Sequence, residues 1–384
     1  MQKYNPPLKL AFIGGSIESA IGYTHFIASQ MDNKFKLTAA CFSREKSINE
    51  RTALAWGIPN ENLYSNWQEL LATQVKNIDA LVILTPTPTH CKIILKALDL
   101  GYAIISEKAL AASFTEGSQI LSLVEKKKSF LAVTHNYTGY PMLRELQHMI
   151  QANKLGKLTQ IRIEMPQESF ALFDNQNTLI SPKKWRLKDA VIPGISLDLG
   201  AHLQHILYFL LQNNPLSLVA HESTFGHFEN VVDDVNCMLK YENNIKVQMW
   251  YSKAALGHRN GLRIEVFGEK GSALWKQTNP EELIHNTCTG IKQILDRASN
   301  VSIANKQKYN RFKVGHPSGF IEAFANVYSD IASELLEYQK GKEPDTEWTY
   351  GCKQSLFGLS LFETIKQSSK EERWIKFSKF KYND

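Results

Sequence analysis

Short apolar runs and stretches of helical periodicity alternate along the first 135 residues of the chain. Strands whose residues are almost all apolar are typical of a parallel sheet that helices cover on both faces. The predicted strands span 8–13, 35–42, 80–84, 103–106 and 130–134, and the predicted helices span 22–31, 48–56, 89–98 and 116–127. This order predicts a doubly wound α/β domain, whose ligands bind beyond the carboxyl ends of the strands.

The pattern changes after Pro141, where strand-like runs alternate apolar and polar residues between turn residues. Such alternation is typical of an antiparallel sheet with one face in the core. The predicted strands span 158–165, 216–223, 235–241, 247–251, 262–267 and 272–275, the predicted helices span 141–153, 197–211, 320–338 and 354–367, and 277–318 is predicted to be irregular. We therefore expect two domains, 1–135 and 136–384, the second an α+β domain whose C-terminal helices pack back on the first.

The composition is typical of a globular protein. With 384 residues, of which 43% are hydrophobic and 21% charged, the chain is long enough for two globular domains. No apolar run approaches the ~18–20 residues of a membrane helix, and the N-terminal sequence does not resemble a signal peptide, so we expect a soluble, cytoplasmic protein. The five cysteines are widely spaced and contain no CxxC pair, which argues against structural zinc and a disulfide framework.

The basic and aromatic residues near the C-terminus permit two interpretations of that segment. The net charge of +6 permits anionic ligands, and the last residues, WIKFSKFKYND, mix aromatic and basic side chains. That mixture occurs in segments that contact nucleic acids or membranes. We favour a docked C-terminal strand and expect neither nucleic acid nor a membrane as a partner.

A glycine turn follows the first predicted strand, in the sequence IGGSIESAIGYTH. Glycines at such a turn allow the backbone to approach a pyrophosphate, which the N-terminus of the next helix attracts. The distance from Gly14 to Gly22 exceeds that of the usual G-x-G-x-x-G pattern by three residues, so an ordinary strand-to-helix turn is the alternative. The position between strand and helix favours a dinucleotide site, and the predicted binding residues are Gly14, Gly15, Ser16 and Ile21.

Polar residues stand at the ends of the following strands as well. The second strand runs into Ser43 and Arg44, at the position where an acid binds the ribose of NAD. An arginine there suits the 2′-phosphate of NADP through charge-assisted hydrogen bonds, so the sequence favours NADP over NAD. In the alternative interpretation, Arg44 is a solvated loop residue and Glu45 binds the ribose. Two further strands end at 85–86 and 107–108, and all these strand ends should meet at one crevice.

The segment ISLDLGAHLQHILYFLL carries three polar groups on an otherwise apolar helix. Asp198 and His202 are four residues apart, and His205 lies three further on, so they share one face. A buried histidine with Asp198 as its partner is the structural alternative. A metal site formed by these residues with His135 is a third interpretation, but the spacing differs from the H-x₃-H of a zinc helix, so we predict no metal.

Seven short motifs occur in the order found in one enzyme family. They are the glycine turn, TPTPTH at 85–90, EKAL at 107–110, THNYTGYP at 134–141, KLGKL at 154–158, KWR at 184–186 and DLGAH at 198–202. In this order the chain resembles the Gfo/Idh/MocA oxidoreductases, the family of glucose–fructose oxidoreductase and inositol dehydrogenase. The resemblance implies an N-terminal NAD(P)-binding Rossmann domain and a C-terminal domain with a large, mostly antiparallel open sheet, through which homodimers or homotetramers form. It also implies hydride transfer between NAD(P) and a sugar, cyclitol or related polyol.

The resemblance also assigns roles to individual residues. The catalytic positions correspond to Lys108, Asp198 and His202. The segments that line the cofactor correspond to Thr85, Pro86, His90, Glu107 and Lys108. The substrate contacts that it suggests are His135, Tyr137, Trp185, Arg186 and His205. The chain departs from the family pattern at Ala109, which replaces a proline, at His205, which replaces an aspartate, and before Asp198, where only Gly194 remains of a glycine cluster.

These residues suggest one mechanism and leave two alternatives. His202 is the predicted base for the hydroxyl proton, Asp198 would orient it, and Lys108 would donate to the reacting oxygen. A non-catalytic dinucleotide-binding sensor or regulatory protein on the same scaffold is the first alternative, which the departures from the family pattern keep open. A metal-dependent sugar enzyme is the second.

Overall fold

The computed structural model describes residues 6–342 and 347–377, without the side chains of Lys184 and Trp185. The chain divides into two compact units, Met1–Gly139 with Gly319–Leu356 and Tyr140–Ser318 with Phe357–Asp384. The first unit extends four residues past the boundary expected at 135. It also includes 319–356, a segment that the sequence pattern placed in the second domain.

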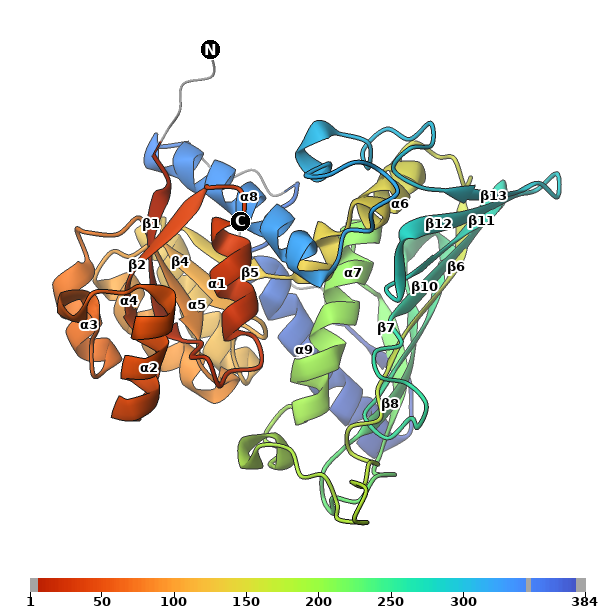
Figure 1. Ribbon diagram of the computed structural model, residues 1–384. Coiled ribbons are helices and arrows are strands. Elements are labelled where there is room, and N and C mark those ends of the chain that lie inside the picture. Colours follow the sequence, from red (N-terminus) through yellow and green to blue (C-terminus); the bar gives the residue numbers. More distant parts are fainter. Residues whose placement is uncertain (1–5, 343–346, 378–384) are drawn as a thin grey trace. The chain divides into compact units, whose positions relative to one another are not determined.

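A five-stranded parallel sheet forms the centre of the first unit (Figure 1). In the spatial order β2-β1-β3-β4-β5, its strands are β1 (Leu8–Gly14), β2 (Phe35–Cys41), β3 (Ala80–Leu84), β4 (Ile104–Glu107) and β5 (Leu131–Thr134). The N-terminal helices are α1 (Gly22–Gln30), α2 (Lys46–Trp56), α3 (Trp67–Gln74), α4 (His90–Asp99) and α5 (Phe114–Lys127). The sheet confirms the predicted doubly wound α/β fold. The helix α3 was not predicted, although the side chain of Asn66 caps it by accepting a hydrogen bond from the backbone N–H of Glu69.

A helix from the end of the chain completes the core of the first unit. α8 (Phe320–Gln339) packs on α1, and its buried residues Phe324, Tyr328 and Ile331 join Leu10 and Phe12 of β1 in one apolar cluster. Removing an apolar helix face from water stabilises the fold in proportion to the area that it buries. This packing explains why α8 belongs to the first unit despite its distance in sequence.

The second unit contains a nine-stranded, mostly antiparallel sheet, as predicted. In the spatial order β13-β12-β11-β10-β6-β9-β8-β7-β14, its strands are β6 (Leu158–Pro166), β7 (Ser217–Ser223), β8 (Asp234–Lys240), β9 (Lys246–Ser252), β10 (Arg263–Gly268), β11 (Gly271–Lys276), β12 (Asn279–Thr287), β13 (Lys292–Leu295) and β14 (Ile375–Lys376). Only β6 and β9 pair in parallel among the described strands of this sheet. The helices α6 (Pro141–Gln151) and α7 (Ala201–Leu211) pack on the sheet, and α9 (Cys352–Glu371) precedes β14.

The prediction that 277–318 is irregular is wrong for its first half. Residues 279–295 form β12 and β13, which extend the sheet beyond β11. Most residues of β12 are partly buried and those of β13 are mostly exposed, so neither strand shows the apolar alternation on which the prediction relied. Backbone pairing with a neighbouring strand, rather than burial, decides their conformation.

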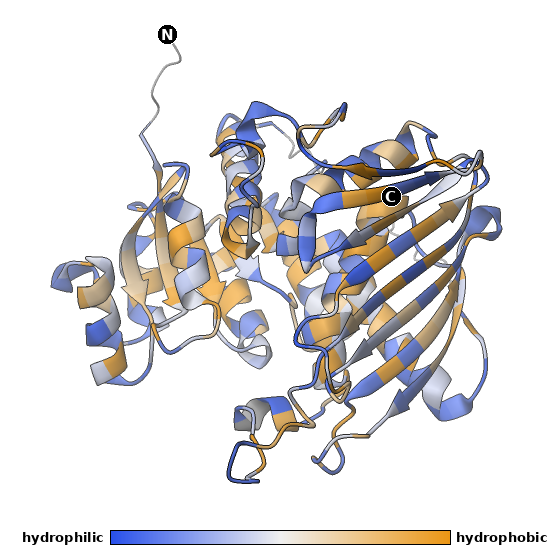
Figure 2. Cartoon of the chain, turned by 45° about the vertical axis from the view of Figure 1, so that its right-hand side comes forward, coloured by the Kyte–Doolittle hydropathy of each residue, from blue (hydrophilic) through white to orange (hydrophobic). Residues whose placement is uncertain are grey.

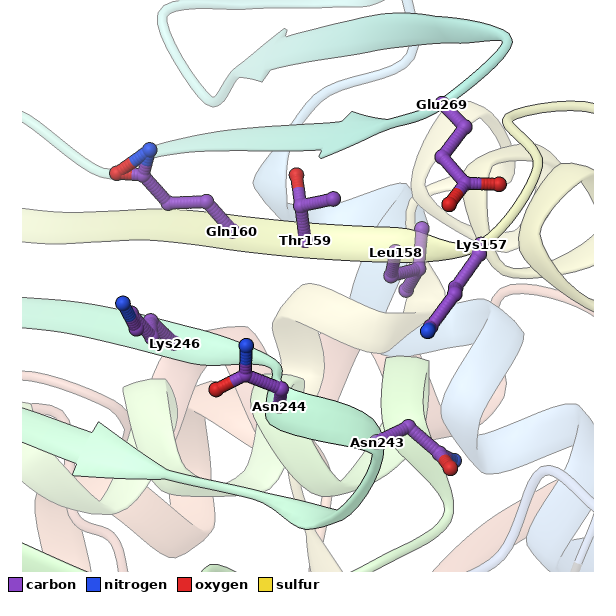
Figure 3. A pocket seen from close by; sticks show the side chains of 8 residues that line it. All are labelled: Lys157, Leu158, Thr159, Gln160, Asn243, Asn244, Lys246 and Glu269. Atoms are coloured by element: carbon purple, nitrogen blue, oxygen red, sulfur yellow. The ribbon is translucent and has the colours of Figure 1, made fainter.

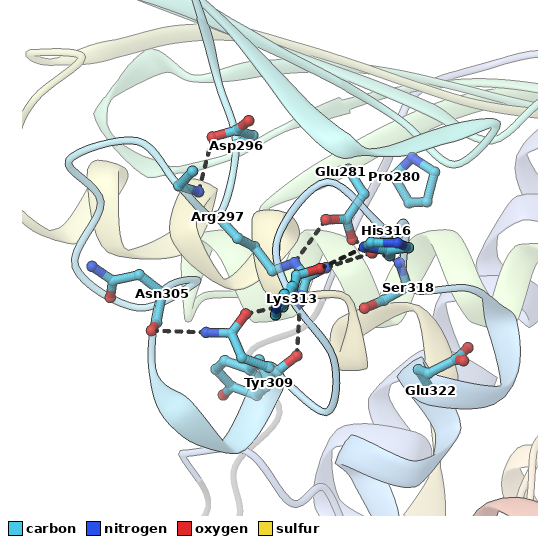
Figure 4. A network of polar contacts seen from close by, with 12 residues as sticks. Pro280, Glu281, Asp296, Arg297, Asn305, Tyr309, Lys313, His316, Ser318 and Glu322 are labelled. Atoms are coloured by element: carbon cyan, nitrogen blue, oxygen red, sulfur yellow. Dashed lines mark hydrogen bonds and ion pairs between the residues drawn. The ribbon is translucent and has the colours of Figure 1, made fainter.

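Hydrogen bonds of Arg297 hold the irregular segment that follows β13 (Figure 4). Its guanidinium is buried and donates to the carboxylate of Glu281 at 2.7 Å and to the backbone oxygen of Tyr309 at 2.9 Å. Glu145 of α6 accepts hydrogen bonds from the backbone N–H groups of 302–304. Buried polar contacts therefore hold this segment, and such contacts leave no periodic pattern in the sequence.

Residues near the C-terminus pair with the nine-stranded sheet. Ile375 and Lys376 form β14 and pair with β7, which confirms the favoured docked strand for these residues. The remaining residues of the tail, 378–384, lie outside the described part of the chain. Within residues 6–342 and 347–377, no helix combines the length and apolar content that crossing a bilayer requires.

Hydrophobic and hydrophilic residues alternate along the strands of the nine-stranded sheet (Figure 2). On β8, Val235, Cys237 and Leu239 are buried, whereas the residues between them are exposed. We call the surface formed by these outward residues the open sheet face. On β6, β8 and β9 it includes Arg162, Asn236, Met238, Lys240, Lys246 and Gln248.

Candidate functional site

The glycine turn lies at the switch point of the parallel sheet. In the order β2-β1-β3, the chain leaves β1 for one neighbouring strand and later returns to β3 on the other side, so the loops after β1 and β3 diverge. Gly14 pairs with Leu84, and a Cβ on Gly14 would lie 2.9 Å from the Leu84 carbonyl group. The two strand ends therefore border the crevice in which sheets of this kind bind ligands.

Three glycines give this turn a backbone that fits a pyrophosphate. Gly14 and Gly15 have φ values of 81° and 73°, in a left-handed region that residues with a Cβ rarely adopt. Gly22 opens α1, and a Cβ there would lie 2.1 Å from the carbonyl oxygen of Gly15. Gly22 thus serves as the last glycine of the usual pattern, and the turn between buried Ser16 and the N-cap residue Ile21 accommodates the extra residues. This close approach of backbone to backbone fits a dinucleotide at the N-terminus of α1.

Ser43 and Arg44 begin the loop that follows β2. The side chain of Asn49 accepts hydrogen bonds from the backbone N–H groups of Phe42 and Ser43 at 2.8 and 3.2 Å, which fixes the start of this loop. Arg44 is exposed and makes no ion pair within the described ranges 6–342 and 347–377. Its guanidinium is therefore available to an anionic group at this end of the sheet.

His90 lies behind the end of β3 rather than at its surface. The side chain is fully buried, and its ring nitrogens lie 2.9 Å from the carbonyl oxygen of Ala109 and 2.7 Å from that of Thr85. Burial lowers the pKa of His90, although both carbonyl oxygens oppose the effect. Thr85 is half-buried and Pro86 is exposed, so these two residues of the strand end remain accessible to a cofactor.

Lys108 follows β4 and is half-buried, and its peptide bond with Ala109 is cis. The residue before it, Glu107, is buried and accepts hydrogen bonds from Thr134 at 2.8 Å and from His25 at 3.2 Å. Burial by itself would raise the pKa of Glu107, but its interactions with His25, Lys108 and Thr134 outweigh burial and lower that pKa. Glu107 is therefore an ionised carboxylate beside the predicted catalytic lysine. His25, which lies on α1, was not predicted as a site residue.

The predicted substrate residues His135 and Tyr137 follow β5, and both are buried. Burial, aided by the charge of Lys108 and opposed by that of Glu107, lowers the pKa of His135 to about 3. The imidazole of His135 is thus neutral at physiological pH and belongs to the polar surroundings of Lys108. The ring of Tyr137 packs instead against Phe320 of α8.

In the second unit, Asp198 lies in a π-helical turn, Ser196–Gly200, that leads into α7. The helix predicted over 197–211 thus begins with a wider turn, of a kind that is frequent at functional sites. Gly200 permits the close packing of this turn, because a Cβ there would lie 2.9 Å from the ring of Phe362. A hydrogen bond of 2.8 Å between Ser196 and Tyr251 ties the turn to β9.

Two cations hold the carboxylate of Asp198. Lys253, which follows β9, donates to Oδ2 at 2.6 Å, and Arg186, from the turn Lys184–Leu187, donates to the same oxygen. The side chain of Lys253 is only 7% exposed, so Asp198 stabilises its charge in place of water. Arg186 was predicted as a site residue, but Lys253 was not. The position of Lys253, two residues after the strand predicted over 247–251, could have revealed it, because a lysine buried at a strand end requires a partner.

His202 and His205 lie on α7, the first half-buried and the second buried. The side chain of Trp185, another predicted site residue, lies outside the described part of the structure. Among the residues that the structure describes, no group of three or more His, Cys, Asp or Glu side chains is arranged to hold a metal ion. The two cations on Asp198 would also repel a metal cation bound there. Arg186 and Lys253 instead stabilise a negative charge on the carboxylate of Asp198.

A polar pocket of the second unit contains none of the predicted site residues (Figure 3). It lies at the start of β6 and at the turn between β8 and β9, and its lining residues are Lys157, Leu158, Thr159, Gln160, Asn243, Asn244, Lys246 and Glu269. Both lysines are exposed to solvent. Because solvated side chains are poorly fixed, we assign no binding role to this pocket.

Several similar proteins are named as oxidoreductases or dehydrogenases. The chain is 29% identical over 336 residues to the uncharacterized oxidoreductase YfiI of Bacillus subtilis (strain 168), with 85% of each protein covered. It is 23% identical over 307 residues to levoglucosan dehydrogenase of Pseudarthrobacter phenanthrenivorans, which covers 72% of this chain and 75% of that protein. The crystal structure of an inositol dehydrogenase homolog from Azotobacter vinelandii, complexed with NAD+, has a TM-score of 0.89 at 22% identity and covers 98% of each chain.

Two family models match successive parts of the chain. Residues 8–135 match an oxidoreductase family with an NAD-binding Rossmann fold, and residues 143–274 match the GFO/IDH/MocA C-terminal domain. The first range ends at the strand β5, and the second runs from α6 to β11. Because models of both domains of one family match this single chain in the family's order, and because its fold agrees with theirs, the chain belongs to the Gfo/Idh/MocA family of NAD-binding oxidoreductases.

Proposed function

We propose that the protein is an NAD(P)-dependent dehydrogenase that moves hydride between the nicotinamide and a hydroxyl-bearing or keto carbon of a sugar, cyclitol or related polyol. The observation that carries this proposal is the position of Lys108, which follows β4 in the sheet of the glycine turn and adjoins the ionised Glu107. A cation on the ligand-binding side of such a sheet can stabilise negative charge on a substrate oxygen. Levoglucosan dehydrogenase and the inositol dehydrogenase homolog, by their names, support the polyol class.

In this proposal, the side chains of the protein hold the substrate and move its proton. His202 accepts the hydroxyl proton, a task for which imidazole is suited near neutral pH. Asp198, which Arg186 and Lys253 keep ionised, stabilises the resulting imidazolium. Lys108 donates a hydrogen bond to the substrate oxygen as negative charge develops on it. The nicotinamide, when bound, supplies or accepts the hydride.

Dinucleotide binding and turnover test this function separately. Fluorescence titration with NADH and NADPH measures binding, and a panel of sugars, inositols and anhydrosugars, followed at the nicotinamide absorbance, measures turnover. We expect binding and the oxidation or reduction of at least one polyol. Binding without any turnover would instead indicate the sensor on the same scaffold, and the absence of binding would contradict both functions.

We further propose that NADP is the preferred cofactor and that Arg44 binds its 2′-phosphate. Replacing Arg44 with alanine should raise the Kd of NADPH by about 10- to 100-fold, because a hydrogen bond to a charged group contributes about 1.5–3 kcal/mol. The Kd of NADH, which lacks that phosphate, should stay within about twofold. Lys34, an exposed cation just before β2, offers the control variant Lys34→Ala. If Arg44→Ala weakened NADH and NADPH equally, Arg44 would not distinguish the two dinucleotides.

We also propose that the open sheet face binds a second copy of the chain. Met238 on this face is 49% exposed, and it lies beside the uncharged outward residues Asn236 and Gln248. In a two-fold symmetric interface the same face of both copies is buried, so one substitution acts twice.

Replacing Met238 with lysine should therefore raise the dimer Kd by at least about 100-fold, since unpaired charges in an interface cost several kcal/mol. Sedimentation velocity over a series of protein concentrations measures this change. Leu54→Lys, at a position that is 85% exposed on α2, is the matched control and should leave the dimer intact. A monomeric unmodified protein, or a dimer that tolerates Met238→Lys, would contradict the proposal.

A further inference from the structure

Two buried histidines contact the residues on either side of Lys108, and the mechanism above uses neither of them. His25 on α1 bonds to Glu107, the residue before Lys108. His90 on α4 contacts Ala109, the residue after it. We propose that His25 and His90 are positioning residues that together hold Lys108 in place from both sides. The inference rests on the proposed function in one respect, because that function makes the placement of Lys108 important.

The imidazole of His25 bridges Tyr328 and Glu107. Burial, aided by the negative charge of Glu107, raises the pKa of Tyr328 well above its usual value, so the phenol keeps its hydrogen. Tyr328 can therefore donate to Nδ1 of His25, 2.7 Å away. An ionised carboxylate only accepts, so Nε2 of His25 must donate to Glu107 at 3.2 Å. The two ring nitrogens of His25 thus connect Tyr328 of α8 to the carboxylate that precedes Lys108.

Glu107 is held from two elements of the sheet domain at once. Thr134 of β5 donates to the same carboxylate oxygen as His25 does. His25 has no exposed surface, and its ring packs edge-on against Phe324 of α8, so it is confined to this position. The backbone of Glu107 continues directly into Lys108, and its charge attracts the ammonium group. Fixing Glu107 therefore limits where the lysine can lie.

His90 constrains the segment on the other side of Lys108. Its ring bridges the carbonyl oxygens of Thr85 and Ala109, at 2.7 and 2.9 Å, and so connects the end of β3 to the segment after β4. A neutral imidazole donates to one of these oxygens and an imidazolium donates to both. Proline fixes its own φ because its ring closes on the backbone nitrogen, whereas alanine does not. The contact with His90 therefore restrains a segment that Ala109 by itself leaves free.

Hydrogen exchange followed by mass spectrometry on the full-length protein separates this role from a merely structural one. In His25→Leu, the amides of 105–112 should exchange at least about tenfold faster, because buried hydrogen bonds that hold this segment are lost. His90→Leu should accelerate exchange in the same segment. His25→Gln keeps a donor towards Glu107 and should retain most of the protection. Tyr102→Phe is the matched control, since it removes a buried phenol that donates to Leu71 at 2.7 Å in the same unit.

Kinetics provide the second measurement. In His25→Leu, kcat should fall by about 10- to 100-fold while the Kd of NADH changes less than about twofold, as expected when a catalytic group is displaced without loss of cofactor binding. Exchange requires no substrate, so a failure to find turnover would remove the proposed function but leave the exchange test valid. The inference would be overturned by unchanged exchange at 105–112 in both leucine variants, or by acceleration that spreads evenly over the whole unit.

Discussion

Replacing His202 with asparagine should lower kcat by about 10²–10⁴-fold, the range expected when a general base is lost. Asparagine is close in size to the imidazole but cannot accept and release a proton near neutral pH. Because the role proposed for His202 concerns the substrate and not the dinucleotide, the Kd of NADH should stay within about twofold. Steady-state turnover with a polyol that the unmodified protein oxidises, together with fluorescence titration of NADH, measures both quantities.

A second histidine of the same unit provides the control for this variant. His148 lies on α6 and is also half-buried, so His148→Asn tests the general cost of the substitution. It should keep kcat within about twofold of the unmodified protein. If both variants lost activity equally, the loss would reflect stability, and if His202→Asn kept full activity, the base would have to be another residue.

Replacing Lys108 with methionine should lower kcat by about 10²–10³-fold, comparable to the loss of a donor in an oxyanion hole. Methionine retains a flexible chain of similar length but cannot donate to the substrate oxygen. The substitution also removes a positive charge that lowers the pKa of Glu107, so the carboxylate should protonate at a higher pH than in the unmodified protein. A pH series of kcat for the variant and the unmodified protein measures the catalytic loss directly.

The matched control for Lys108 is an exposed lysine of the same sheet. Lys36 lies on β2 with its side chain in solvent, and Lys36→Met should leave kcat unchanged within about twofold. Combining Lys108→Met with His25→Leu adds a further criterion. If His25 acts through Lys108, the double variant should be little slower than Lys108→Met alone, whereas independent roles would give additive losses.

The carboxylate of Asp198 accepts hydrogen bonds from two cationic side chains of the second unit. Lys253 and Arg186 come from segments that are separated by β7, β8 and β9 in sequence, and both donate to the same oxygen of Asp198. Two cations on one carboxylate stabilise its negative charge, and this suits the role proposed for Asp198, which is to stabilise positive charge on the imidazole of His202. The sequence indicated Asp198 and His202 as a pair, and the tertiary structure adds the cations that keep one member charged.

The sequence alone determined the architecture and the positions of the main polar residues. The strand predicted over 80–84 coincides with β3, and the order of apolar strands and amphipathic helices predicted the parallel sheet. These features are local, because each strand or helix repeats its own hydrophobic period and each motif is a few residues long. Lys108 was likewise recognisable because a charged residue at the end of an apolar strand requires an explanation.

Only the tertiary structure decided which residues surround those groups. Tyr328 and His25 are separated by more than 300 residues, and Lys253 lies 55 residues from Asp198, yet each pair shares a hydrogen bond. The strands β12 and β13 likewise owe their conformation to pairing with neighbours rather than to a period of their own. Hydrophobic periodicity records only the side of an element that is buried. It contains no information about which distant side chain meets a buried polar group, because that contact forms when separate elements pack together.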